Sequence, residues 1–217
     1  MTMNLTLNIL PVTAFAQNCS LVMCNTTRKT AIIDPGGDVD KILAALQKMD
    51  ALPEKILLTH GHIDHAGAAM ALARALDIPI VGPHRADAFW LNGLAQQAQM
   101  FRFAQVENCT PDQWLNDGEQ ICIGNLYFTV IHTPGHTPGH VVFYSAEHKL
   151  AFVGDVLFHG SIGRTDFPQG NYEDLIASIR TKLFPLGEDV TFIPGHGEHS
   201  TFGEEMISNP FVADHRG

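Results

Sequence analysis

Short apolar runs alternate along the chain with longer segments of helical spacing. The apolar runs, which are typical of buried strands, lie at residues 5–16, 55–59, 126–131, 149–153 and 190–193. Helical stretches are expected at roughly residues 38–49, 65–76, 85–94 and 171–183. Because strands and helices alternate, the pattern predicts a layered α/β architecture.

Composition favours one domain with no affinity for polyanions. With 217 residues and 45% hydrophobic content, and with no linker or repeat, residues 1–217 are predicted to form a single domain. Asp and Glu number 23 against 13 Lys and Arg, a net charge of −10. No basic run is available to contact phosphates, so nucleic acid is not expected as a partner. No segment reaches the roughly 20 apolar residues of a membrane span, so a membrane is not expected either.

The first apolar run superficially resembles a secretory signal, because it ends in Ala14-Phe15-Ala16. The first positive charge is Arg28, however, and a signal peptide needs positive charge before its apolar core. We therefore expect an opening strand. The four cysteines show no Cys-x-x-Cys spacing, which favours reduced, buried thiols in a cytoplasmic protein.

A cluster of metal-ligand residues follows the run at 55–59. His60, His62, Asp64 and His65 fall within six positions. In extended backbone His60 and His62 project to the same side, whereas Asp64 and His65 fall at the start of the expected helix and can face a second position. This spacing predicts two metal ions rather than one.

Three later segments supply further candidate ligands. His136, Asp155 and His196 each follow a predicted strand and have a glycine as neighbour. Glycine lets the backbone approach closely, so a rigid sheet could present these loops at one rim.

These motifs, in this order, resemble the metallo-β-lactamase-fold hydrolase superfamily, and within it the glyoxalase II (hydroxyacylglutathione hydrolase) branch. The resemblance runs from Asp34-Pro35-Gly36-Gly37 to Pro194-Gly195-His196-Gly197. It implies a four-layer αββα sandwich with metals at one edge between the sheets. It also implies that His60, His62 and His136 bind one metal ion, that Asp64, His65 and His196 bind the second, and that Asp155 bridges both.

The donor types suit a catalytic site with two divalent ions. Imidazole and carboxylate favour zinc, with iron or manganese as alternatives, and no cysteine takes part. Two such ions would share a water whose pKa falls to about 7, so that hydroxide attacks a thioester carbonyl. Asp64 and Asp155 are the protein groups expected to act with this hydroxide. By the resemblance, the substrate is S-D-lactoylglutathione or a related acyl-glutathione thioester, as in methylglyoxal detoxification.

Several residues permit two interpretations. Arg164 falls where the glyoxalase II pattern often has a basic residue that contacts a carboxylate of glutathione, but it could instead pair with Asp166. Asp34 could orient a ligand imidazole or only cap a turn. His140 is expected to pack or to support the site rather than bind metal. The aromatic residues Trp90, Phe158 and Phe167 could line a pocket or sit in the core, and the core is expected for each.

Some features depart from the glyoxalase II pattern. The chain ends 21 residues after His196, which leaves no C-terminal helical region to contact glutathione. Two positions that commonly hold tyrosine hold Asp166 and Glu198 instead. Weaker glutathione recognition in a more open site is therefore expected.

Two rival functions remain open. A persulfide dioxygenase of the same superfamily uses one iron and oxygen, and residues 163–167 resemble that branch equally well; oxygen dependence would separate the two. The second rival is a metal-stabilised binding module without enzymatic activity, and the complete ligand set disfavours it. The bridging Asp155 also argues against β-lactam hydrolysis as the main activity, because lactamases of the superfamily generally lack it.

Overall fold

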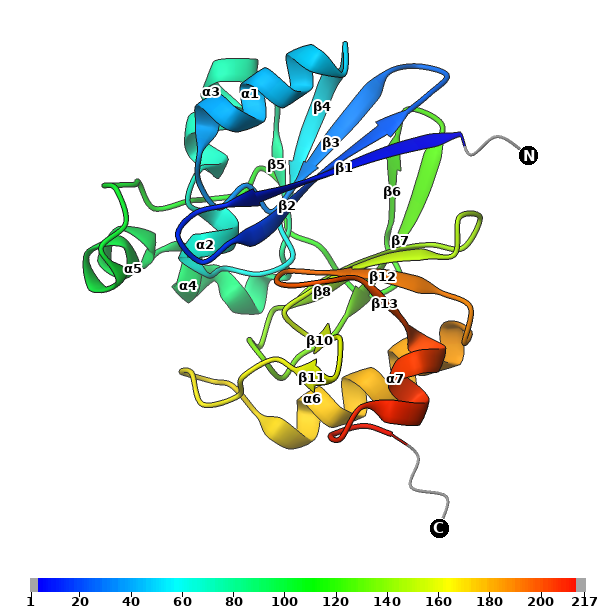
Figure 1. Ribbon diagram of the computed structural model, residues 1–217. Helices are drawn as coiled ribbons and strands as arrows, with labels where there is room; N and C mark the ends of the chain where they lie inside the picture. The colour runs from blue at the N-terminus through cyan, green and yellow to red at the C-terminus, as the bar shows by residue number, and fades with distance from the viewer. Residues whose placement is uncertain (1–3, 214–217) are drawn as a thin grey trace.

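The computed structural model describes residues 4–213 (Figure 1). The strands are β1 (Leu5–Val12), β2 (Gln17–Cys24), β3 (Lys29–Ile33), β4 (Leu52–Leu57), β5 (Ile80–Val81), β6 (Gln120–Ile123), β7 (Leu126–His132), β8 (Val141–Ser145), β9 (Leu150–Gly154), β10 (Leu157–Phe158), β11 (Ser161–Ile162), β12 (Thr191–Pro194) and β13 (Ser200–Thr201). The helices are α1 (Val39–Lys48), α2 (Ile63–Ala66), α3 (Ala69–Leu76), η1 (Arg85–Asp87), α4 (Ala88–Leu91), α5 (Leu94–Phe101), α6 (Tyr172–Ser178), η2 (Ile179–Leu183), η3 (Phe184–Leu186) and α7 (Phe202–Ser208). None of these helices is both long and apolar enough to cross a lipid bilayer.

Two mixed sheets form the middle of the molecule. The first has the order β1-β2-β3-β4-β5 and the second the order β13-β12-β9-β8-β7-β6. In the first sheet, β3, β4 and β5 run parallel; in the second, β9 and β12 do. A small hairpin, β10-β11, follows β9 in the chain and forms a separate two-stranded sheet. Parallel neighbours end at the same edge, which brings the loops after β4, β9 and β12 toward one region.

Alternation of side chains along the strands explains the four layers. In β2 and β3, Val22 and Ile33 face the second sheet and pack with phenylalanines such as Phe128 and Phe143. Their neighbours Leu21 and Ile32 face the opposite way, into a cluster with α1 and α3. The outer face of the second sheet packs on α6, η2 and α7. Both faces of both sheets are apolar: the inner faces pack against each other, and helices cover the outer face of each sheet, as Figure 1 shows.

The predicted strands and layers are confirmed, and several boundaries differ. The helical stretch expected at 65–76 is present but divided into α2 and α3, because the N–H of Ala68 donates to the carbonyl of Pro35 at 2.9 Å instead of continuing the helical ladder. The helix expected at 85–94 is η1 and α4, and α5 follows separately. The one expected at 171–183 is α6 followed by the π-helical turn η2. The four cysteines are free, but Cys122 is exposed, contrary to expectation.

Candidate metal centre

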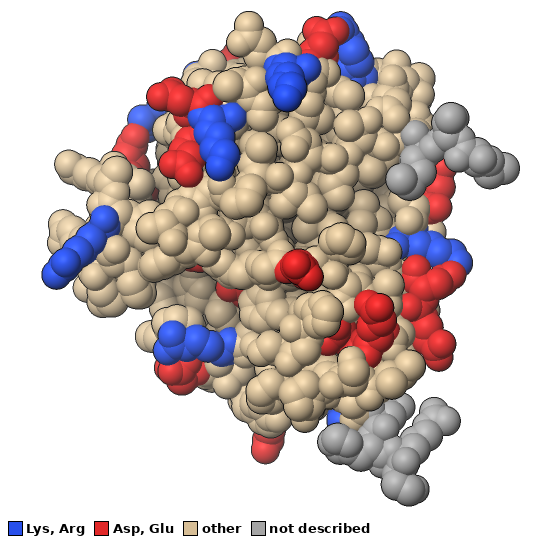
Figure 2. Space-filling model, in the orientation of Figure 1, with Lys and Arg blue, Asp and Glu red and all other residues tan. Residues whose placement is uncertain are grey.

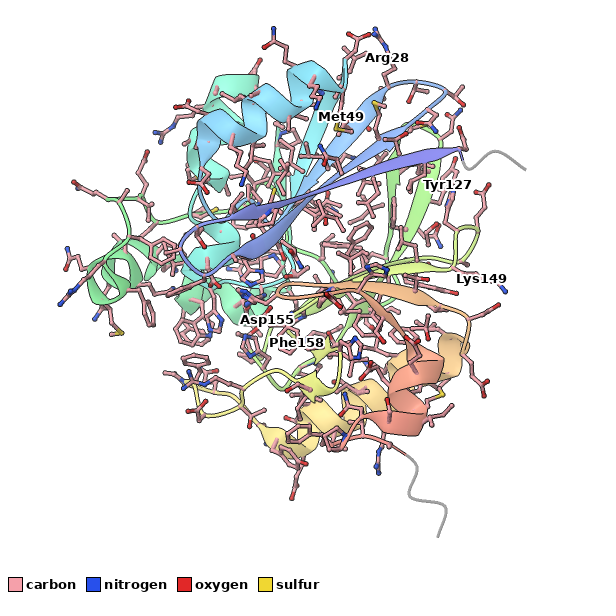
Figure 3. All side chains as sticks on the ribbon, in the orientation of Figure 1. Arg28, Met49, Tyr127, Lys149, Asp155 and Phe158 are labelled. Atoms are coloured by element: carbon pink, nitrogen blue, oxygen red, sulfur yellow. The ribbon has the colours of Figure 1, made fainter. Side chains whose placement is uncertain are left out.

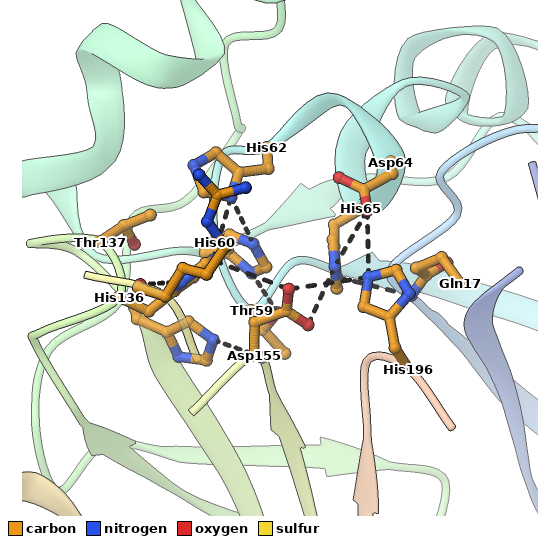
Figure 4. A network of polar contacts seen from close by, with 12 residues as sticks. Gln17, Thr59, His60, His62, Asp64, His65, His136, Thr137, Asp155 and His196 are labelled. Carbon is orange, nitrogen blue, oxygen red and sulfur yellow. Dashed lines mark hydrogen bonds and ion pairs between the residues drawn. The ribbon is translucent and has the colours of Figure 1, made fainter. Parts of the chain in front are cut away.

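The predicted ligand residues meet where the two sheets end together. His60 and His62 lie in the loop after β4, and Asp64 and His65 lie on α2. The other three residues follow strands of the second sheet: His136 after β7, Asp155 after β9 and His196 after β12. Figure 4 shows their side chains converging, and Figure 3 places Asp155 between the two halves of the molecule.

Three imidazoles form the first cluster. Nδ1 of His62 lies 3.1 Å from Nε2 of His60 and 3.1 Å from Nε2 of His136. One nitrogen has either one proton or one lone pair, so Nδ1 of His62 can form a hydrogen bond with only one of these neighbours. Three ring nitrogens that converge in this way are the donor arrangement that a cation would satisfy.

Burial keeps these rings neutral. Desolvation, followed by repulsion from the neighbouring rings, holds the pKa of His60 well below its usual range. Burial and the nearby His136 lower the pKa of His62 to about 3. The pKa of His136 is also lowered, chiefly by burial. At neutral pH the cluster therefore presents lone pairs rather than positive charges.

The second cluster contains a carboxylate and two imidazoles. Oδ2 of Asp64 lies 3.1 Å from Nε2 of His196 and 3.8 Å from Nε2 of His65. Asp155 stands between the clusters: its Oδ1 is 3.3 Å from Nε2 of His65, and its Oδ2 is 3.7 Å from Nε2 of His136. Oδ1 of Asp155 and Nε2 of His65 are buried without a hydrogen-bond partner in the described structure. Buried oxygen and nitrogen atoms without a hydrogen-bond partner are suitable ligands for a metal ion at this position.

Charges in the second cluster reverse the protonation pattern. Burial would lower the pKa of His65, but the carboxylates of Asp155 and Asp64 outweigh it and raise that pKa well above the usual range. The pKa of His196 is likewise raised, against burial, by its hydrogen bond with Asp64. In Asp155, attraction by the His65 ring overcomes burial and lowers the carboxyl pKa.

A second set of contacts turns the imidazoles toward the clusters. Nδ1 of His136 donates to the carbonyl of Arg164 at 2.7 Å, and Nδ1 of His196 donates to the carbonyl of Phe15 at 3.2 Å. Nδ1 of His65 contacts Oδ2 of Asp34 at 2.9 Å. In His136 the proton on Nδ1 leaves the lone pair of Nε2 directed at its cluster. In His65 and His196, whose pKa values are raised, Nε2 also points at the cluster but must lose a proton before it can bind a metal ion.

Asp34 settles one of the open alternatives. Besides His65, it accepts hydrogen bonds from the backbone N–H of Thr59 at 2.7 Å and from the Thr59 hydroxyl at 2.6 Å. The Thr59 hydroxyl in turn lies 3.0 Å from Nδ1 of His60. Asp34 therefore orients imidazoles of both clusters rather than only capping a turn.

His140 contacts the first cluster and Asp155 without belonging to either cluster, in agreement with the expected supporting role. Its Nε2 accepts the backbone N–H of Asp155 at 3.1 Å, and its ring stacks on that of His60 with centroids 4.8 Å apart. Burial lowers the pKa of His140 well below its usual range, so the ring stays neutral. The turn that places Asp155 also needs a glycine: Gly154 has φ +48°, and a Cβ there would lie 2.6 Å from the His140 ring.

Asp87 is an important residue that the sequence did not reveal. Its buried carboxylate accepts hydrogen bonds from the N–H of Gly61 at 2.9 Å, the N–H of Gly139 at 2.6 Å and the hydroxyl of Thr137 at 2.8 Å. These donors belong to the two loops that hold the first cluster. A single Asp in a helical stretch carries no motif, so only tertiary structure identifies it.

A cleft of about 810 Å³ opens onto both clusters. It is lined by His62, Asp64, His136, Asp155 and His196 on its floor, and mostly by apolar side chains elsewhere. Trp90, Phe158 and Phe167 all line it, so the expectation that they belong to the core is wrong. Trp90 lies on the short helix α4, Phe158 in the β10-β11 hairpin and Phe167 in a loop, and the sequence pattern does not specify how these short segments pack. Glu198 is not among the described lining residues.

Arg164 lies at the rim of the cleft with its guanidinium already paired. Its Nε and Nη2 donate to the two carboxylate oxygens of Asp166, at 2.9 and 2.8 Å, and the guanidinium lies 4.5 Å from the ring centroid of Phe167. Pairing with Asp166 was one of the two interpretations of this residue. Contact with a substrate carboxylate remains a prediction.

Comparison with known proteins agrees with this geometry. A model of the metallo-beta-lactamase superfamily matches residues 12–196. The chain belongs to this superfamily. The two mixed sheets with flanking helices are its sandwich fold, as the sequence motifs predicted.

Relatives within the superfamily cover nearly the whole chain. Hydroxyacylglutathione hydrolase GloC of Haemophilus influenzae is 47% identical over 95% of this chain and 97% of its own. Among solved structures, TTHA1623 in a di-iron-bound form has a TM-score of 0.86 at 37% identity, covering 94% of this chain and 100% of its own. BLEG-1, described as a B3 metallo-beta-lactamase, has a TM-score of 0.88 at 35% identity, covering 96% and 100%.

Proposed function

We propose that the protein hydrolyses S-D-lactoylglutathione or a related acyl-glutathione thioester, in the manner of a glyoxalase II of short form. The observation that carries the proposal is the pair of donor clusters joined by Asp155 at the floor of the cleft. Similarity to GloC favours this substrate class over others in the superfamily.

The donor set fits two divalent ions, and zinc is the preferred metal, with iron and manganese as alternatives. Three imidazoles would bind the first ion; Asp64, His65 and His196 would bind the second, and Asp155 would contact both. Bound there, the ions would supply Lewis acidity and a water acidic enough to serve as nucleophile near neutral pH.

The protein's own groups would position the reaction. Asp155, held through its backbone by His140, fixes the spacing of the two clusters. Asp64 pairs through Oδ2 with Nε2 of His196 at 3.1 Å and lines the cleft. The aromatic side chains around the floor limit access of bulk water, which strengthens the electrostatic interactions inside.

The decisive test uses metal-loaded and metal-stripped protein on S-D-lactoylglutathione, with and without oxygen. We expect loss of thioester absorbance that needs about two ions per chain and no oxygen. Asp155→Ala should reduce turnover severely, whereas Asp189→Ala, which removes an exposed carboxylate far from the clusters, should not. Oxygen uptake on glutathione persulfide, with one iron and no thioester loss, would move the assignment to the dioxygenase. Metal-stripped protein that keeps its fold but loses turnover would exclude a binding module.

β-Lactam hydrolysis is a second candidate, because BLEG-1 is described as a metallo-beta-lactamase and is 35% identical. The same preparations should be assayed on a chromogenic cephalosporin. We expect the thioester to be the better substrate by kcat/KM. The reverse order would make the lactamase the main activity.

A further inference from the structure

The cleft has an apolar wall that metal binding does not require. The wall consists of Phe15 in the turn between β1 and β2, Phe89 and Trp90 of α4, and Met100 and Phe101 of α5. Nine large apolar side chains are exposed among residues 4–213, and four of them belong to this wall, including Met100 at 68% and Phe15 at 45%. Exposed apolar surface concentrated beside a reactive centre indicates a binding surface.

Two segments far apart in the chain build the wall together. The ring of Phe15 meets those of Phe101 and Phe103 edge-on, with centroids 6.0 and 5.2 Å apart. The carbonyl of Phe15 also accepts the hydrogen bond from His196. The wall is therefore fixed to the second cluster, within reach of any substrate held there.

The cleft has little to attract an anion beyond the metals. The charged side chains among its described lining residues are Asp64, Asp155 and Arg164, apart from the histidines. Arg164 already forms two hydrogen bonds with Asp166. In Figure 2, lysines and arginines are scattered over this face, most of them beside acidic side chains, and form no basic patch. A carboxylate of a glutathione conjugate could bind Arg164 only by sharing it with Asp166 or displacing Asp166, so the lining attracts such an anion weakly.

We propose that the cleft prefers thioesters with a large apolar group, an aromatic ring or a medium-length alkyl chain, next to the scissile carbonyl. The apolar wall is the specificity determinant. This inference rests on the proposed thioester hydrolysis and adds the chemical class of the substrate. The apolar group could belong to the acyl half or to the thiol half of the substrate.

Two substrate series separate these sources. In the first, glutathione is constant and the acyl group changes from lactoyl and acetyl to butyryl, hexanoyl and phenylacetyl. In the second, lactoyl is constant and the thiol changes from glutathione to N-acetylcysteamine and benzyl mercaptan. We expect kcat/KM to rise with apolar size in one series or both, by about three- to fourfold for each methylene that the wall buries.

A matched pair of variants tests the wall itself. Phe101→Ala should flatten the rise, whereas Phe211→Ala should not, because Phe211 has a similar exposure (44% against 41%) but lies outside the cleft. Values of kcat/KM that stay flat or fall in both series, with lactoylglutathione still hydrolysed, would overturn this inference alone. A similar response of the two variants would also overturn it. Failure of the metal-loaded protein on every thioester would reject the proposed function together with it.

Discussion

At the scale of single residues, the contact on one side of an imidazole decides what the other side can bind. Carbonyls of Arg164 and Phe15 hold protons on the Nδ1 atoms of His136 and His196, and Asp34 does the same for His65. Nε2 of each ring is thereby directed at its cluster, with a lone pair in His136 and, in His65 and His196, a proton that a metal ion would displace. Supporting contacts of this kind typically change metal affinity 10- to 100-fold when they are removed.

Asp34→Asn should therefore weaken metal binding at the second cluster by about 10- to 100-fold. An NH₂ group in place of Oδ1 would face the backbone N–H of Thr59, and one in place of Oδ2 would face both the Thr59 hydroxyl and Nδ1 of His65. Either arrangement sets a donor against a donor and disturbs the acceptor that orients the His65 ring. Metal titration against a competing chelator would measure the loss. Asp189→Asn is the control, since its carboxylate is exposed. Unchanged affinity in Asp34→Asn would show that the His65 ring needs no acceptor.

Arg164→Ala should raise KM several-fold with little change in kcat. The substitution removes an exposed ion pair, which contributes little to stability, and any contact with a substrate carboxylate. It leaves the backbone carbonyl that holds His136 in place. Steady-state kinetics on lactoylglutathione would measure both constants. Equal proportional losses of kcat and kcat/KM would contradict a role limited to substrate binding.

At the scale of elements, the loops that hold the first cluster depend on a carboxylate from a third segment. Asp87 in η1 joins the loop of His62 to the loop of His136 through three hydrogen bonds. Burial raises the pKa of Asp87 to about 6, against these bonds, so the carboxylate is ionised at neutral pH. Without it, three donors in the interior would lose their acceptor.

Asp87→Ala should destabilise metal-free protein by about 3 kcal/mol or more, because each unsatisfied buried donor costs roughly 1–3 kcal/mol. Urea unfolding at pH 7 would measure the change in free energy. Asp189→Ala, at an exposed ion pair, should leave the free energy of unfolding almost unchanged. A loss in Asp87→Ala as small as in this control would mean that water replaces the carboxylate.

The same elements show what the sequence could and could not predict. The candidate ligands were accessible because each lies in a short motif directly after a strand, and strand pattern fixes where a strand ends. The sequence did not reveal Asp87 or the apolar wall. What they contact depends on how η1, α4, α5 and the β1-β2 turn pack against loops distant in the chain. The break between α2 and α3 was missed for a similar reason: the acceptor for Ala68 is Pro35, thirty-three positions earlier in the chain.

At the scale of the whole molecule, two sheets contribute clusters that differ in protonation. In metal-free protein the first cluster is neutral, since the pKa values of His60, His62 and His136 are lowered. In the second cluster the pKa values of His65 and His196 are raised by the neighbouring carboxylates. Metal binding at the second cluster must therefore displace protons, whereas binding at the first need not.

This difference predicts that the two ions respond differently to pH. A raised histidine pKa means that the ring still holds its extra proton at pH 6.5, so affinity at the second cluster should increase as pH rises through that value and level off only above the raised pKa. Affinity at the first cluster should be nearly constant over that range, because its rings have already lost their protons. Calorimetric titration of metal-free protein with zinc, in buffers of different ionisation enthalpy, would count the protons released by each ion.

His196→Ala provides the internal check on that assignment. It removes one of the two proton-binding rings and leaves the three imidazoles of the first cluster intact. The proton-releasing, pH-dependent step should weaken or disappear, while the pH-independent step remains. If instead the remaining step releases protons, or if both steps in the unmodified protein are independent of pH, the carboxylates do not control protonation of the second cluster. The ligand nitrogens of both clusters would then be equally free of protons, and the order in which the ions bind would depend on coordination alone.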